Sequence, residues 1–62
     1  MHKTATYKNG WSVYMGEPNG MAGLRLVTLR DANGDIRDKM RCDTYRGALE
    51  YYAAFKRVAK NA

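Results

Sequence analysis

The chain has very little of the chemistry that most enzymes and metal proteins need. It contains one cysteine, Cys42, and one histidine, His2, in 62 residues. A single cysteine cannot close an internal disulfide, and zinc sites need several Cys or His ligands at short spacing. Nucleophilic catalysis needs a base beside the nucleophile, and the one histidine is at the second position. We therefore expect no enzyme activity, no bound metal and no cofactor.

Long apolar runs are also missing from the sequence. No run approaches the roughly 18 residues that a membrane span needs. The first six residues lack the apolar stretch of a secretory signal. Together with the low cysteine content, these absences predict a cytoplasmic protein that does not enter a membrane.

What the chain does have is a normal apolar content and an excess of positive charge. Hydrophobic residues make up 45%, too much for a disordered chain, and the formal net charge is +5. A domain of this size buries only about 60% of its unfolded surface. A catalytic pocket would take residues from so small a core. The composition therefore favours one small domain over residues 1–62 that binds a partner through its surface.

Turn signals divide the chain into three expected strands and one helix. Pro18-Asn19-Gly20 ends the first strand, and 31–35 predicts a three-residue hairpin loop with Gly34 in the left-handed region. Asp43-Thr44 offers an N-cap. The expected bounds are about 7–15, 23–30 and 36–42 for the strands and about 44–60 for the helix, with 1–5 mobile. The fold class is thus α+β, a three-stranded antiparallel meander covered on one face by a C-terminal helix (β-β-β-α).

Periodicity indicates which side chains form the core. Apolar residues recur at helical spacing and form one stripe on the predicted helix: Tyr45, Ala48, Leu49, Tyr52, Phe55 and Ala59. In the third strand Ile36, Asp38, Met40 and Cys42 alternate with Arg37, Lys39 and Arg41. Three cations cannot face an apolar stripe without a large desolvation cost. We therefore expect the basic triplet to face outward and Cys42 to face the core.

The register of the other strands follows from the loops. If Asp31 pairs with Asp35, Arg25, Val27 and Leu29 lie outward beside Arg41, Lys39 and Arg37, in that order. Leu24 and Leu26 then face inward. The first strand has two solutions. In one, Trp11 and Val13 lie outside and Tyr14 inside. With a loop longer by an odd number of residues, Trp11 and Val13 join the core and Tyr14 turns outward.

The expected uncovered face is basic, with apolar and aromatic residues between the charges. Lys and Arg neutralise phosphates and read guanine edges, and a sheet can enter the major groove. We therefore predict binding of nucleic acid, most of all double-stranded DNA. The candidate binding residues are Arg25, Arg37, Lys39, Arg41, Trp11, Tyr14 and Val27.

The same face predicts an alternative, because charge also steers encounters between proteins. In that interpretation the chain is an inhibitor or adaptor of the kind that phages and mobile elements encode. It would dock on a host protein complex such as a CRISPR complex or RNA polymerase. A homodimer through a free sheet edge is compatible with either interpretation.

The order of elements resembles the AP2 family and the arm-binding domains of phage integrases. Arg30-Asp31 before a turn at Gly34, followed by Asp43-Thr44, Ala48 and Tyr52, matches the order of the AP2 pattern. The resemblance implies DNA binding through an exposed three-stranded sheet. The family's Trp-Leu-Gly-x-Phe strand is here Asp38-Lys39-Met40-Arg41-Cys42, and its DNA-contacting tryptophans are replaced. No contact residue is therefore carried over.

Overall fold

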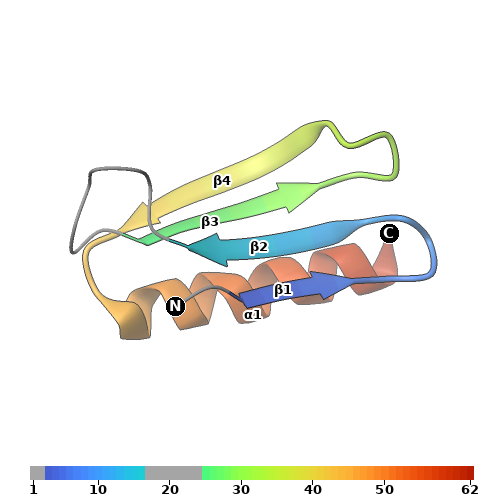
Figure 1. Ribbon diagram of the computed structural model, residues 1–62. Helices are drawn as coiled ribbons and strands as arrows, with labels where there is room; N and C mark the ends of the chain where they lie inside the picture. Colours follow the sequence, from blue (N-terminus) through green and yellow to red (C-terminus); the bar gives the residue numbers. More distant parts are fainter. Residues whose placement is uncertain (1–2, 17–24) are drawn as a thin grey trace.

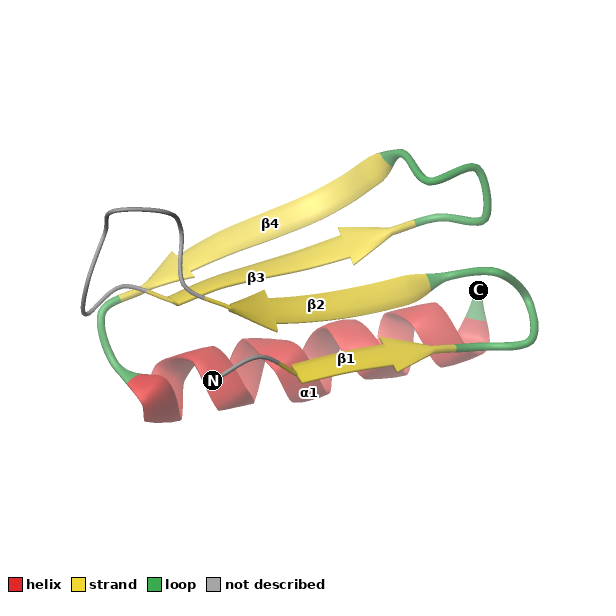
Figure 2. Ribbon diagram, in the orientation of Figure 1, coloured by secondary structure: helices red, strands yellow, loops and turns green. Residues whose placement is uncertain are grey.

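The computed structural model describes residues 3–16 and 25–62 and contains a four-stranded antiparallel sheet with one C-terminal helix. The elements are β1 (Lys3–Thr6), β2 (Ser12–Gly16), β3 (Arg25–Arg30), β4 (Ile36–Cys42) and α1 (Tyr45–Asn61). The strands follow one another across the sheet in chain order, and α1 lies along one side of it (Figure 1, Figure 2). The α+β class is confirmed, but the prediction of three strands is wrong.

The additional strand comes from a hairpin turn inside the expected first strand. The N–H of Tyr7 donates to the carbonyl of Trp11 at 3.0 Å, and that of Gly10 to Tyr7 at 2.9 Å. Gly10 has a φ of 91°, a conformation that glycine adopts at little cost. Residues 3–6 therefore fold back onto β2. Of residues 1–5, which the sequence predicts to be mobile, 3–5 belong to β1, and residues 1–2 lie outside the described part of the chain.

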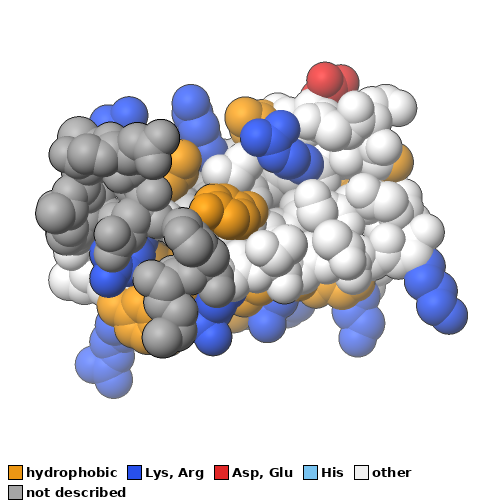
Figure 3. All heavy atoms as spheres, viewed as in Figure 1, with side chains coloured by type: hydrophobic (Ala, Val, Ile, Leu, Met, Phe, Trp, Pro, Cys, Tyr) orange, Lys and Arg blue, Asp and Glu red, His pale blue; other side chains and the backbone are white. Residues whose placement is uncertain are grey.

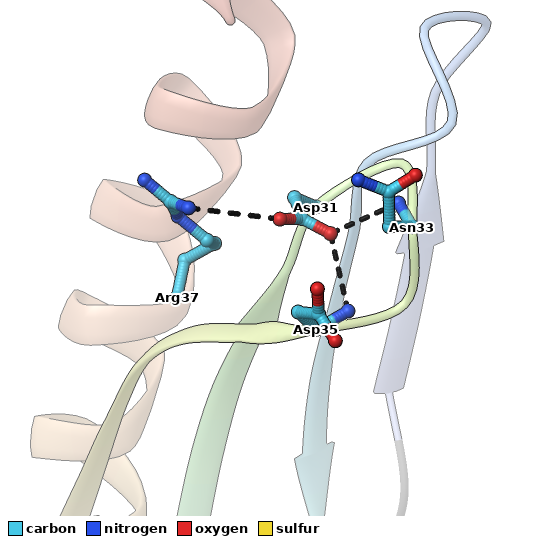
Figure 4. A network of polar contacts seen from close by, with 4 residues as sticks. All are labelled: Asp31, Asn33, Asp35 and Arg37. Carbon is cyan, nitrogen blue, oxygen red and sulfur yellow. Dashed lines mark hydrogen bonds and ion pairs between the residues drawn. The ribbon is translucent and has the colours of Figure 1, made fainter.

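The loop between β3 and β4 has the same backbone pattern. Asp31 N–H donates to the carbonyl of Asp35, and Gly34 N–H to that of Asp31, both at 3.0 Å. The φ of Gly34 is 85°, so the predicted three-residue loop is confirmed. The Asp31 carboxylate accepts bonds from the backbone N–H groups of Asn33 and Asp35 at 2.9 and 3.1 Å (Figure 4). Side chain and backbone therefore fix this turn together.

A bulge in β4 changes the register expected from that loop. Arg30 pairs with Ile36, but the next pair joins Leu29 to Asp38. Arg37 is the extra residue on β4. Side chains alternate across a strand. A shift of one residue therefore changes which side chains of β3 and β4 lie on the same face of the sheet. The predicted pairing of Leu29 with Arg37 is therefore wrong.

The hydrophobic core lies between α1 and one face of the sheet. Val13, Met15 and Val27 are fully buried there, and the helix contributes Ala48, Tyr52, Phe55 and Ala59. Val13 is in the core and Tyr14 faces away, as in the second solution for the first strand. The reason is not a loop longer by an odd number of residues: Val13 pairs with Leu29, which the bulge in β4 places on the core side. The prediction for Leu24 falls outside the described residues.

The helix starts where its capping residue predicts. Oγ1 of Thr44 accepts a hydrogen bond from the N–H of Gly47 at 3.0 Å. A methyl group on Gly47 would stand 3.1 Å from that oxygen, so glycine leaves room for the cap. Cys42, just before the cap, is buried as predicted. Burial, and next the nearby charge of Asp43, raise the pKa of its thiol.

Candidate nucleic-acid interface

The face of the sheet opposite the helix is the candidate interface. The register joins its residues into rows, because directly paired residues of neighbouring strands point to the same side. We call this surface the outer face; its residues are Thr4, Thr6, Ser12, Tyr14, Gly16, Leu26, Thr28, Arg30, Ile36, Lys39 and Arg41.

The charged residues of the outer face are all cations. They are Arg30, Lys39 and Arg41, and all three are exposed. The one acidic residue of β4, Asp38, pairs with Leu29 and therefore points to the helix side. Its carboxylate accepts a hydrogen bond from the backbone N–H of Lys39 at 2.8 Å. The outer face thus presents positive charge with no carboxylate between the cations.

The three cations follow one another along the β3–β4 ribbon. Arg41 lies across from Leu26, Lys39 across from Thr28, and Arg30 across from Ile36. Successive outward rows of a sheet are about 7 Å apart. The cations therefore occupy three consecutive rows, two of them on β4 and one on β3. Because β4 is an edge strand, this ribbon is the part of the sheet best placed to approach a groove.

Apolar side chains lie beside the cations. Tyr14 is 39% exposed and Ile36 is 49% exposed, both large values for such residues. In Figure 3, viewed with the helix behind the strands, apolar side chains lie over the middle of the sheet with Lys and Arg towards β4. The surface therefore offers both charge and a contact area for a ring or methyl group.

Two of the predicted site residues lie on the other side of the sheet. Val27 is fully buried in the core, and Arg25 pairs with Cys42 on the same side. The Arg25 guanidinium lies 6.0 Å from the centre of the Tyr45 ring, a cation–π distance. The expectation that Arg25, Val27 and Leu29 face outward is wrong, because it assumed a β4 without the bulge. The expected inward position of Leu26 is wrong for the same reason, since Leu26 pairs with Arg41 on the outer face.

The remaining predicted residues are divided between the two faces. Lys39, Arg41 and Tyr14 are on the outer face. Trp11 is half-buried against the core. Arg37 is exposed at the bulge, where its Nη1 lies 3.7 Å from a carboxylate oxygen of Asp31 (Figure 4).

Sequence reasoning missed two residues of the outer face, Arg30 and Ile36. Nη1 of Arg30 donates to the carbonyl of Gly34 at 2.9 Å, so the turn also orients this side chain. A signal for the bulge was present in the sequence. In the regular register expected from the loop, Val27 and Leu29 lie on one side of the sheet, and Met40 and Cys42 lie on the other. One extra residue in β4 places these four apolar side chains on the same side.

The described part of the chain contains neither a candidate metal site nor a helix that could span a membrane. Within residues 3–16 and 25–62, no three His, Cys, Asp or Glu side chains are grouped so that they could share a metal ion. The helix in this part is neither long nor apolar enough to span a membrane. Comparison with known protein families, with curated proteins and with solved structures gives no match to the chain.

Proposed function

We propose that this protein binds double-stranded DNA through the outer face of its sheet. The observation that supports the proposal most is the run of three exposed cations, Arg30, Lys39 and Arg41, with no carboxylate on the same face. Phosphate contacts from such residues supply most of the affinity of non-specific DNA binding. Tyr14 and Ile36 would pack against the sugar–phosphate backbone or the edges of bases.

The form of the surface favours a duplex over a single strand. The major groove of B-DNA is about 12 Å wide and admits a two-stranded ribbon. The three cations lie on one such ribbon, β3–β4, at the edge of the sheet. Single-stranded nucleic acid is held mainly by several aromatic side chains on which bases stack. Among the outer-face residues defined above, Tyr14 is the one aromatic.

Fluorescence anisotropy with a labelled random duplex and the matching single strand tests the proposal. We expect the double variant Lys39→Gln/Arg41→Gln to lose about tenfold or more in affinity for the duplex, because two phosphate contacts disappear. Lys8→Gln is the control, since Lys8 is an exposed lysine in the β1–β2 loop. It should change the affinity by about twofold or less, because salt screens distant charges.

The outcomes separate the proposal from its alternatives. A wild-type protein that is folded by circular dichroism but does not bind the duplex contradicts the proposal. Equal losses in the double variant and in Lys8→Gln would mean that net charge alone drives binding. Tighter binding of the single strand than of the duplex would mean that the ligand is single-stranded nucleic acid.

A protein-docking inhibitor or adaptor is the second candidate function. It is favoured by the exposed apolar residues of the helix, Tyr45, Tyr51 and Val58, which are 41%, 41% and 50% exposed. The tagged protein should then recover one partner in stoichiometric amount, and the recovery should fall in Tyr51→Ser/Val58→Ser. Tight DNA binding without such a partner would count against this candidate.

A further inference from the structure

A second basic surface lies on the helix, on the side that faces away from the sheet. The buried residues of α1 are Ala48, Tyr52, Phe55 and Ala59. The helical period of 100° per residue places a group of exposed residues opposite that stripe. We call this group the helix face; it consists of Arg46, Glu50, Ala53, Arg57, Lys60 and Asn61.

The helix face carries three cations and one carboxylate. Within the described part of the chain, no carboxylate lies at ion-pair distance from Arg46, Arg57 or Lys60. Arg46 and Arg57 are about 16 Å apart along the axis, from the rise of an α-helix. Their charges are therefore spread along the helix, and Glu50 is the one carboxylate of the helix face that offsets them.

Helix stability does not account for the charge on Arg46. This residue is in the first turn, which contains no acidic residue. The helix macrodipole favours acidic side chains at that end and disfavours cations. Arg46 is exposed, stands at a position that the dipole disfavours and has no ion pair among residues 3–16 and 25–62, which points to contact with an anionic partner.

The two basic surfaces face opposite directions. Because α1 packs on the inner side of the sheet, its exposed side and the outer face point away from each other (Figure 2). The shortest dimension of the molecule is 17 Å. Salt screens charges over about 8 Å at physiological ionic strength. An anion on one face therefore interferes little with an anion on the other.

We propose that the helix face binds a second DNA duplex, so that one protein molecule bridges two duplexes. This inference rests on the proposed function, because the first duplex occupies the outer face of the sheet. The helix face is the weaker of the two sites, since Glu50 lies between its cations. Cations on both sides also offset the repulsion between the two bridged duplexes.

A bead assay separates bridging from simple binding. One duplex is fixed to beads, the protein is added, and retention of a second, fluorescent duplex is measured. We expect the wild type to retain the second duplex at low salt and to release it as salt rises. The variant Arg46→Gln/Arg57→Gln/Lys60→Gln should lose at least about tenfold in retention and keep its affinity for a single duplex in anisotropy. Glu50→Gln is the matched control and should extend bridging to higher salt.

Each result supports or overturns the inference. Binding of one duplex without retention of a second overturns it and leaves the proposed function standing. A protein that binds no duplex at all contradicts both the proposed function and this inference. Undiminished bridging by the triple helix variant, with a dimer seen in light scattering, would assign bridging to two sheet faces of a dimer. Loss of all DNA binding in that variant would place the duplex site on the helix and contradict both this inference and the proposed function.

Discussion

Asn9 and Ala59, fifty positions apart in the chain, are joined by a hydrogen bond from Nδ2 of Asn9 to the carbonyl oxygen of Ala59, 2.8 Å long. The same amide donates to the carbonyl of Ala62 at 3.2 Å, and its Oδ1 accepts from the N–H of Trp11 at 3.0 Å. One side chain therefore shapes the first hairpin turn and caps carbonyls at the end of the helix. The carbonyl of Ala59 also accepts from the N–H of Ala62 at 3.4 Å. This contact ties the β1–β2 hairpin to α1.

Asn9→Ala should destabilise the protein through the loss of this cap. We expect the free energy of unfolding to fall by about 1–2 kcal/mol, since a hydrogen bond contributes about 1 kcal/mol. Asn33→Ala is the matched control, because Asn33 holds the same position in the second turn. Its change should stay within about 0.5 kcal/mol. Urea unfolding measures both, and equal losses would show that the turn matters and the helix contact does not.

The two hairpin loops also touch each other. A methyl group built on Gly10 would stand 3.0 Å from Cβ of Ala32, whereas one on Gly34 would meet nothing within 4 Å. Both glycines have a left-handed φ, so either change to alanine should cost about 1–2 kcal/mol. Gly10→Ala should cost more, and Ala32→Gly in that background should recover part of the excess, since Cα of residue 32 would still lie 3.2 Å from the added methyl group. If Ala32→Gly recovers nothing, the loops do not press on each other in solution.

The thiol of Cys42 predicts a loss of stability at alkaline pH. Burial, then the charge of Asp43, raise its pKa above the ordinary value. A raised pKa in the folded state means that the unfolded chain releases this proton first, so stability falls as pH rises through the thiol range. Urea midpoints measured from neutral to alkaline pH should decline, and Cys42→Ala should decline less over the thiol range. If the urea midpoints of the wild type and of Cys42→Ala fall by the same amount over this pH range, the Cys42 thiol is not the cause of the decline.

Sequence reasoning predicted the helix, its Thr44 cap, the 31–35 loop and the core position of Cys42. It missed β1 because Tyr7–Trp11 was interpreted as strand, although Asn9-Gly10 stands in the same positions as Asn33-Gly34. Local turn chemistry was thus sufficient in both hairpins. The faces of β3 could not be derived from the loop alone, because one bulged residue at Arg37 reverses the alternation. The predicted outward position correspondingly agrees with the structure for Lys39 and Arg41 and disagrees with it for Val27.

The salt dependence of duplex binding tests the central claim most directly. The logarithm of the binding constant is plotted against the logarithm of salt concentration for the wild type, Lys39→Gln and Lys8→Gln. Three phosphate contacts predict a wild-type slope of about −3, and loss of one contact should reduce its magnitude by about 1 in Lys39→Gln. Lys8→Gln should keep the wild-type slope. A flat salt response, or the same slope in all three proteins, would contradict the assignment of DNA binding to the outer face.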